Sequence, residues 1–170
     1  MNQLIVMRHA KSDWNTGLHD HDRPLARRGQ RAAPAMAEWL SEEDLCPTRV
    51  LTSSAARARQ TADAVIETCS IEPEDVDVDP DLYLASASMW LRAASDVGDT
   101  HRPDSLLICG HNPGFDDLVD YLAEGNFELS GSGKLMTTAA IAVFEFASWA
   151  EITPQTASLT ELKRPSDLDY

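Results

Sequence analysis

The chain has little positive charge and no long hydrophobic run. Its 170 residues carry 14 Lys and Arg against 28 Asp and Glu, which gives a net charge of −14 at pH 7. Such a charge repels the phosphates of nucleic acids unless a basic stripe intervenes, and the sequence contains no such stripe. The apolar runs fall far short of the ~20 residues that cross a bilayer. We therefore expect neither a nucleic-acid partner nor a membrane partner.

Cysteine is also scarce. The three cysteines, Cys46, Cys69 and Cys109, form no Cys-x-x-Cys pair, and an odd number cannot be fully paired within the chain. The simplest interpretation is that they are small core or helix residues, which fits a reducing compartment. The N-terminus opens directly into an apolar segment, without the basic and apolar regions of a secretory leader. These features predict a cytoplasmic protein.

What is present suits one compact domain. With 43% apolar residues and no linker-like stretch, residues 1–170 are expected to form a single domain. Apolar strand-like runs alternate with helix-like segments, which is the pattern of parallel βαβ units in an α/β fold. The strands are expected at 3–7, 49–52, 105–109, 141–146 and 157–162, and the helices at 27–44, 55–69, 87–97 and 113–124. Residues 163–170 resemble a loose tail.

A charged pair stands where the first apolar run ends. Arg8 and His9 directly follow the apolar residues 4–7. Open α/β sheets bind their ligands at the carboxyl ends of the strands, which is where this pair falls. The alternative is a strand that simply ends in solvated polar residues. The functional interpretation gains weight because another arginine and another histidine also follow strands further along the chain.

An arginine lies at the start of the helix expected after residues 49–52. Ser53 and Ser54 suit N-capping, and Arg57 follows within the first helical turn. A cation there is disfavoured by roughly a few tenths of a kcal/mol, because the helix dipole is positive at this end. Its presence suggests a nearby anion. A solvated arginine whose stem covers apolar surface is the alternative.

A histidine occupies the third strand-to-helix junction. Gly110 and His111 follow the apolar residues 106–109, and the next helix is expected to begin with Asn112 as its N-cap and Pro113 as its first residue. This places His111 at a strand tip beside free backbone N–H groups, which form a natural anion site. A structural histidine bonded to the backbone is the alternative.

Three strand tips would bring Arg8, His9, Arg57 and His111 to one edge of the sheet. Guanidinium groups match phosphoryl oxygens bidentately, and a neutral imidazole can attack phosphorus while a second imidazole donates to the developing charge. One of the two histidines would attack phosphorus in line, the other three side chains would hold the equatorial oxygens, and water would complete the hydrolysis. The arginines should lower the pKa of His9 and keep it neutral. No metal or other cofactor is required, because the protein supplies the cations.

These residues resemble the signature of the histidine phosphatase superfamily, also called the phosphoglycerate mutase-like superfamily. Its Arg-His-Gly signature carries the histidine that is phosphorylated during turnover. Here the signature reads Arg8-His9-Ala10, a variant known in the short, SixA-type phosphohistidine phosphatases. By position, Arg57 corresponds to the second phosphate arginine of the family and His111 to its second pocket histidine. The resemblance implies a three-layer α/β/α fold with a mostly parallel central sheet.

Further segments extend the resemblance over nearly the whole chain. Ser12 and Asn15 match the continuation of the signature, whose polar members line the phosphate or substrate pocket. Arg23 begins a segment similar to the one after the first loop of SixA-type proteins, and residues 136–141 are similar to their late turn and strand. The resemblance implies that Ser12, Asn15 and Arg23 contact the substrate.

The chain also departs from many members of the family. These members carry a carboxylic acid after the second histidine, or in a middle loop, that protonates an alkoxide leaving group. Here Asn112 follows His111, and the middle region offers Asp79 and Asp81 without a clear acidic motif. A missing acid matters least when the leaving group is already good, as a protonated imidazole is. This favours phosphohistidine over an unactivated ester, with Asp81 or a group of the substrate as the alternative acid.

Two other motifs carry less weight. Residues 18–22 include two histidines and two aspartates, but adjacent loop residues of these types are more often solvated than bound to a metal. Residues 131–134 are similar to a phosphate-binding loop, but Glu128 replaces its first glycine and Leu135 its final Ser or Thr. We expect neither a metal site nor a nucleotide-binding P-loop.

The leading hypothesis is a phosphatase that hydrolyses phosphohistidine on a protein, such as a histidine phosphotransfer domain, through a phosphohistidine intermediate at His9. The first alternative is a phosphomonoesterase that acts on a small phosphorylated metabolite. The second is a protein that binds phosphate groups without turning them over.

Overall fold

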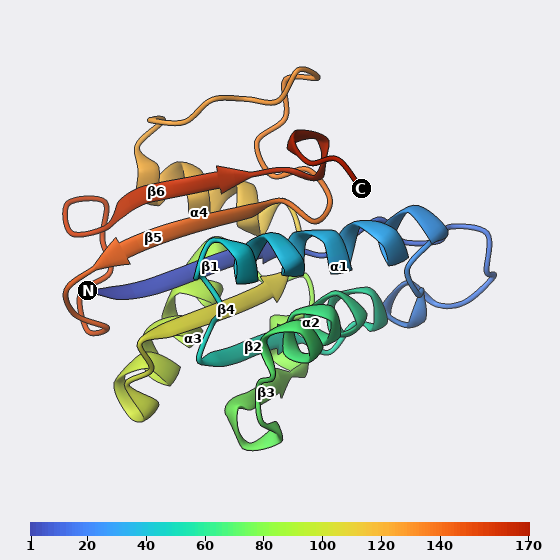
Figure 1. The fold of residues 1–170 in the computed structure, drawn as a ribbon. Helices are drawn as coiled ribbons and strands as arrows, with labels where there is room; N and C mark the ends of the chain where they lie inside the picture. Colours follow the sequence, from blue (N-terminus) through green and yellow to red (C-terminus); the bar gives the residue numbers. More distant parts are fainter.

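A six-stranded sheet forms the centre of the molecule in the computed structural model, which describes residues 1–170. Its strands are β1 (Asn2–Arg8), β2 (Arg49–Ser53), β3 (Val76–Asp79), β4 (Ser105–Gly110), β5 (Ile141–Phe146) and β6 (Ser158–Lys163). They lie in the order β3-β2-β4-β1-β5-β6 (Figure 1). β1 to β4 are parallel, whereas β5 pairs antiparallel with β1 and β6 pairs antiparallel with β5.

Two helices cover each face of the sheet. The helices are α1 (Arg27–Glu42), α2 (Ala56–Cys69), α3 (Ala87–His101) and α4 (Gly114–Ala123). Figure 1 shows α1 and α2 on one face and α3 and α4 on the other. The predicted three-layer α/β/α architecture with a mostly parallel sheet is thereby confirmed. None of the helices combines the length and the hydrophobicity needed to cross a membrane.

The sequence of β1 shows why its middle residues, Leu4 to Met7, are apolar without interruption. Leu4 and Val6 belong to the hydrophobic cluster under α3 and α4, whereas Ile5 and Met7 belong to the cluster under α1 and α2. Successive strand residues point to opposite faces, so a strand covered by helices on both sides must be apolar at every position. The middle of β1 and the whole of β4 are therefore buried, and the site lies at the carboxyl ends of these two strands.

The register of the parallel strands sets the positions of those tips. Arg8 at the end of β1 pairs with Gly110 at the end of β4, and Thr52 near the end of β2 pairs with Cys109. The residues that follow these three strands consequently leave the sheet at one edge. This is the convergence that the sequence pattern predicts.

The structure adds a strand that the sequence analysis did not predict. β3 has only four residues, in which Val76 and Val78 alternate with Asp77 and Asp79 inside an acidic stretch. Arg49, which is 6% exposed, forms ion pairs with Asp75 and Asp77 and so ties this edge of the sheet together. An alternation this short is a weak signal, and the pairing of β3 with β2 makes the strand evident.

The prediction of a loose tail at residues 163–170 is wrong. Lys163 ends β6, and Arg164 is only 7% exposed. The guanidinium of Arg164 donates to the carbonyls of Leu135 and Glu128, at 2.9 and 2.6 Å. The end of the chain is therefore tied to the long connection between α4 and β5.

The interpretation of all three cysteines as unpaired is also wrong. Cys46 and Cys69 form a disulfide, and Cys109 alone is free and buried in β4. The two partners are 23 residues apart in the sequence, and the packing of α1 against α2 brings them together. The cysteine argument for a reducing compartment therefore does not hold for this pair.

Candidate active site

His9 lies at the tip of β1 in a defined tautomer. Its side chain is buried, and its ring Nδ1 is 2.8 Å from the carbonyl oxygen of Ala10. A carbonyl oxygen can only accept a hydrogen bond, so we assign the ring proton to Nδ1. The lone pair of a neutral imidazole then resides on Nε2, which is the atom available for nucleophilic attack.

The surroundings keep His9 neutral. Burial lowers the pKa of His9 from 6.5 to about 3, although the hydrogen bond to Ala10 opposes this shift. The charges of Arg57 and Arg8 act in the same direction as burial. Desolvation, rather than the arginine charges expected from the sequence, has the larger effect.

Arg8 and Arg57 approach His9 from different elements. Arg8 is the last residue of β1, and its Nη1 donates to the carbonyl of Met136 at 3.0 Å. Arg57 lies in the first turn of α2, is 3% exposed, and donates to the backbone oxygen and the carboxylate of Asp20 at 2.7 and 3.0 Å. The Nε–H of each arginine is buried and has no partner.

His111 lies beside His9, with their ring centroids 5.3 Å apart. It follows β4 and is almost completely buried, and its Nε2 is 2.8 Å from the hydroxyl oxygen of Ser53. The Ser53 hydroxyl can donate its proton to Nε2 while its oxygen accepts from the N–H of Ala55, and we assign this arrangement to a neutral His111. The other ring atom, Nδ1, then carries a proton that has no partner. Burial, reinforced by the charge of Arg57, lowers the pKa of His111 to about 4.

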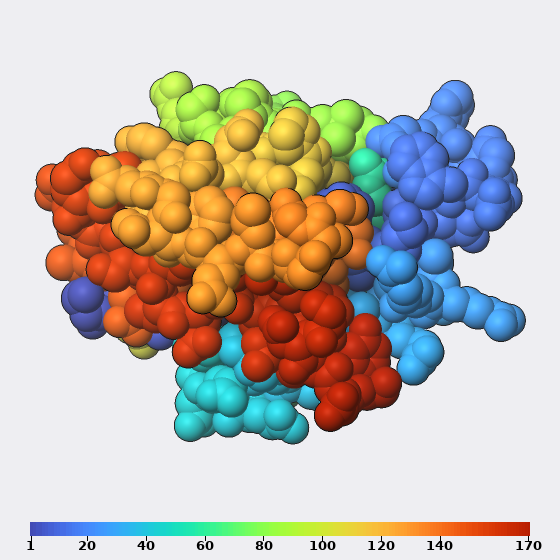
Figure 2. All heavy atoms as spheres, turned by 90° about the horizontal axis from the view of Figure 1, so that it is seen from above, coloured from blue at the N-terminus to red at the C-terminus, as the bar shows by residue number.

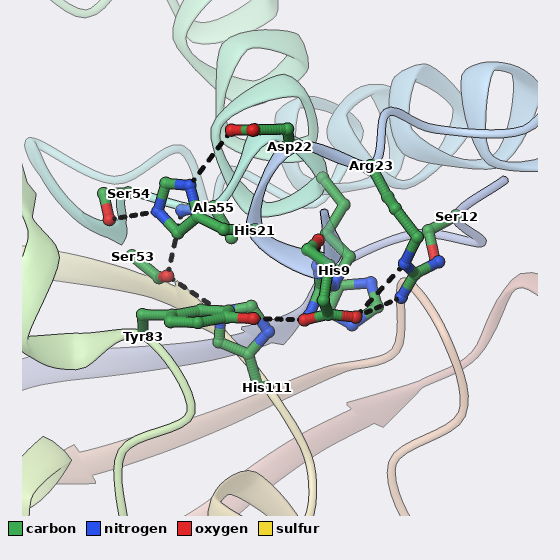
Figure 3. A network of polar contacts seen from close by, with 12 residues as sticks. His9, Ser12, His21, Asp22, Arg23, Ser53, Ser54, Ala55, Tyr83 and His111 are labelled. Carbon is green, nitrogen blue, oxygen red and sulfur yellow. Dashed lines mark hydrogen bonds and ion pairs between the residues drawn. The ribbon is translucent and has the colours of Figure 1, made fainter. Parts of the chain in front are cut away.

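The two serines before α2 do not cap this helix as the sequence suggested. α2 begins at Ala56 with Ala55 as N-cap and no side-chain cap. Ser53 instead contacts His111, and Ser54 lies 2.8 Å from Nε2 of His21 (Figure 3). Ser53 is thus a site residue that the capping interpretation missed.

Asp20 connects several groups of the site. Its carboxylate accepts hydrogen bonds from Arg57, from two guanidinium nitrogens of Arg23, and from the Tyr83 hydroxyl. The bond from Tyr83, followed by those from the arginines, holds the pKa of Asp20 below its usual range. The sequence analysis placed Asp20 in a solvated loop and did not single out Tyr83. No local pattern reveals their contact, because they are 63 residues apart.

The structure brings two of the three expected substrate contacts into the site. Arg23 is 5% exposed, donates to the hydroxyl of buried Ser12 at 2.7 Å, and stacks on the Trp14 ring, 3.6 Å from its centroid. Asn15 lies outside, with an exposed side chain and its backbone N–H bonded to Asp13. A cavity of about 340 Å³ is lined by His9, Ser12, Arg23 and the other cations described above.

The residues of the discounted metal motif, 18–22, have other partners. Asp20 is held by the arginines, and His21 contacts Ser54 and, at 3.4 Å, Asp22. No group of three metal-ligating side chains is present in the structure.

The fold and the site define an α/β protein with a cation-lined cavity beside a neutral histidine. The chain belongs to the histidine phosphatase superfamily. Residues 4–83 match the histidine phosphatase superfamily (branch 1). Over 144 residues the chain is 31% identical to the phosphohistidine phosphatase SixA of Escherichia coli. This match covers 82% of the chain and 83% of the Escherichia coli protein.

Two further likenesses extend over almost the whole chain. An uncharacterised protein of Mycobacterium tuberculosis is 35% identical over 169 residues, or 94% of this chain and 99% of its own length. The structure of the protein histidine phosphatase SixA complexed with tungstate matches with a TM-score of 0.77 and 25% identity, and covers 98% of this chain and 99% of that one. Together with the family, these likenesses support phosphatase activity.

Proposed function

We propose that the chain is a cytoplasmic phosphatase that hydrolyses phosphohistidine on a protein, such as a histidine phosphotransfer domain, and that His9 is its nucleophile. One observation carries the proposal. Three of the four buried side-chain polar atoms without a partner are Nε of Arg8, Nε of Arg57 and Nδ1 of His111. Buried donors normally have partners, so three unsatisfied N–H groups around His9 indicate room for the oxygens of a phosphoryl group.

The first step of the proposed reaction transfers the phosphoryl group to His9. Nε2 of His9 attacks phosphorus and a new P–N bond forms. The P–N bond of the substrate breaks, its electron pair stays on the substrate nitrogen, and the imidazole leaves as a neutral ring because its other nitrogen already carries a proton. Arg8, Arg57 and His111 donate to the equatorial oxygens and stabilise their charge. No proton must leave His9 beforehand, because its Nε2 is already unprotonated.

The second step regenerates the enzyme. Water attacks the phosphorus of phospho-His9, the P–N bond to Nε2 breaks, and inorganic phosphate leaves. The hydrogen bond from Nδ1 of His9 to the Ala10 carbonyl keeps the ring oriented through both steps. The protein's own donors supply the positive charge that the reaction needs.

The leaving group argues for a phosphoramidate. Asp20, the acidic residue that lines the cavity, is held ionised by its hydrogen bonds. Asn112, which follows His111, donates to the carbonyl of Met136 and accepts from the N–H of Asp116, and an amide offers no acidic proton. A substrate whose leaving group needs no strong acid suits this site best, and the imidazole of phosphohistidine is such a group.

A small phosphorylated metabolite is the second candidate substrate. A polar groove of metabolite size adjoins the cavity at His9, because Lys11 and Thr138 line both. If phosphate esters were turned over far faster than phosphohistidine, with a pH profile that requires a carboxylic acid, this second function would replace the first.

The decisive experiment offers the protein a phosphotransfer domain phosphorylated on histidine. We expect release of inorganic phosphate and an acid-labile phosphoenzyme that is trapped on brief incubation. His9→Ala should abolish both, whereas the control His19→Ala should retain both, because His19 is exposed and lies outside the cavity. Turnover that survives His9→Ala would overturn the proposal.

A further inference from the structure

A second cavity adjoins the one above His9. It has a volume of about 440 Å³, and Lys11 and Thr138 line both cavities. The rest of its wall comes from the start of α1, from residues 130–137 and from the C-terminal residues 165–170. Figure 2 shows these blue, orange and red segments meeting on one face of the molecule. We call this cavity the side groove.

The side groove differs in charge from the rest of the surface. Its wall contains the cations Lys11 and Arg28 and no Asp or Glu side chain, although the chain has twice as many acidic as basic residues. Hydroxyl groups make up much of the remaining wall, from Ser130, Ser132, Thr137, Thr138 and Ser166. The backbone N–H groups of Gly131 and Ser132 have no partner. This combination of donors suits an anion.

The two backbone segments that carry the cations of the side groove are in close contact. Gly29 in α1 packs against the chain at Lys11, where a Cβ atom would lie 2.2 Å from the carbonyl oxygen of Lys11. The same oxygen accepts a hydrogen bond from the N–H of Ala26 at 2.9 Å. The backbone at Arg28 is therefore held close to the backbone at Lys11, so that both side chains start from the same side of the side groove.

We infer that the side groove binds a second anionic group, a phosphate or a carboxylate, of the same substrate whose phosphoryl group lies above His9. The inference rests on the proposed function and narrows its substrate to molecules with two anionic groups. The shared wall at Lys11 and Thr138 argues for one ligand that spans both cavities. Cavities of roughly 300–1,000 Å³ commonly hold small ligands. The lining is mostly polar, so charge and hydrogen bonding rather than apolar contact would select the ligand.

The test compares alkane bisphosphonates of increasing length with monophosphonates of equal length, by titration calorimetry. We expect the bisphosphonate that spans the two cavities to bind about tenfold more tightly than its monophosphonate counterpart, as expected for one charge-assisted contact. Arg28→Gln should reduce the ratio of the two dissociation constants, monophosphonate over bisphosphonate, nearly to one. Arg27→Gln is the matched control and should keep the ratio, because Arg27 is exposed on the same turn but does not line the side groove.

The source of the second anion is identified with phosphohistidine peptides. A peptide with Glu next to the phosphohistidine is compared with its Gln counterpart in the parent protein and in Arg28→Gln. An Arg28-dependent preference for Glu would identify an acidic segment of a protein substrate. A bisphosphonate ratio that depends on Arg28, without such a preference, would identify a small molecule.

The inference fails if no bisphosphonate binds more tightly than its monophosphonate, or if Arg28→Gln leaves the ratio unchanged. Calorimetry needs no turnover, which separates this failure from that of the proposed function. A protein that shows the ratio but does not hydrolyse phosphohistidine overturns only the proposed function. A protein that hydrolyses phosphohistidine without the ratio overturns only the role of the side groove.

Discussion

The carboxylate of Asp20 forms an ion pair with Arg57, with Oδ2 and Nη2 at a distance of 3.0 Å. The sequence pattern predicts that Arg57 faces an anion, and in this structure the anion is a side chain of the same protein. Arg23 contacts the other oxygen of the same carboxylate. Asp20 therefore orients two cations of the site and at the same time competes with the negative charge of a substrate.

This competition predicts the effect of Asp20→Asn. The substitution keeps the shape of the side chain but removes its charge, which frees Arg57 and Arg23 for an incoming anion. Because the Asp20 side chain is 43% exposed, water screens the ion pair, and its loss should strengthen the binding of inorganic phosphate by ~1 kcal/mol, or about fivefold. Calorimetry with phosphate measures the change. Weaker binding in the variant would mean that Asp20 chiefly holds the arginines in place.

Ser53 should position His111 for catalysis. Ser53→Ala removes the partner of Nε2, so His111 no longer keeps its proton on Nδ1 and loses its preferred tautomer. We expect kcat to fall about ten- to a hundredfold with little change in KM, because the lost donor acts mainly on the charge of the transition state. Nitrogen chemical shifts of the His111 ring report the tautomer directly.

The control for this variant is Ser54→Ala. Ser54 contacts His21 rather than His111, so its removal should leave both kcat and the ring signals of His111 unchanged. An unchanged tautomer in Ser53→Ala, or an equal loss of kcat in the two variants, would contradict a positioning role for Ser53.

The residues that the sequence identified share one property. Arg8, His9 and His111 stand at the ends of β1 and β4, whose apolar runs are strong because both faces of these strands are buried, and Arg57 lies in the first turn of the helix after β2. The end of such a strand is visible in the sequence, and parallel strands bring their ends to one edge. Local pattern and topology together were enough to place these side chains.

The residues that the sequence did not identify depend on contacts between distant segments. The sequence predicts Ser53 as an N-cap and Asp20 as a loop residue. Tyr83 falls in a segment without regular alternation. The roles of Asp20 and Tyr83 arise only when η1 (Asp20–Asp22) packs on α2 and on the chain after η3 (Pro80–Leu82). Ser53 meets His111 only because β2 and β4 pair side by side. The disulfide between Cys46 and Cys69 belongs to the same class, because its partners meet only through the packing of α1 and α2.

Reduction of that disulfide should lower stability without changing catalysis. The cross-link joins residues 23 positions apart and restricts the unfolded chain. Without it the unfolded chain gains conformational entropy, which should lower the free energy of unfolding by roughly 3 kcal/mol. Cys46 precedes β2, so it lies at the opposite edge of the sheet from Ser53 and the active site. Urea denaturation and turnover of Cys46→Ser measure the two effects. A variant as stable as the parent, or one that loses turnover while folded, would contradict this prediction.

The low pKa values of His9 and His111 predict how the activity and the stability of the protein change with pH below about 6.5. Their pKa values of about 3 and about 4 lie below 6.5, the value of an unfolded chain, so the folded protein takes up fewer protons than the unfolded one at pH 5. The free energy of unfolding should therefore fall as the pH drops from about 6.5 towards 4, and His9→Asn should remove part of this fall. Both rings should stay neutral in the folded protein at pH 5, which carbon and nitrogen chemical shifts measure. Ring signals that titrate near pH 6.5 would show that burial does not exclude the proton, and the unprotonated nucleophile would then be lost in the same range.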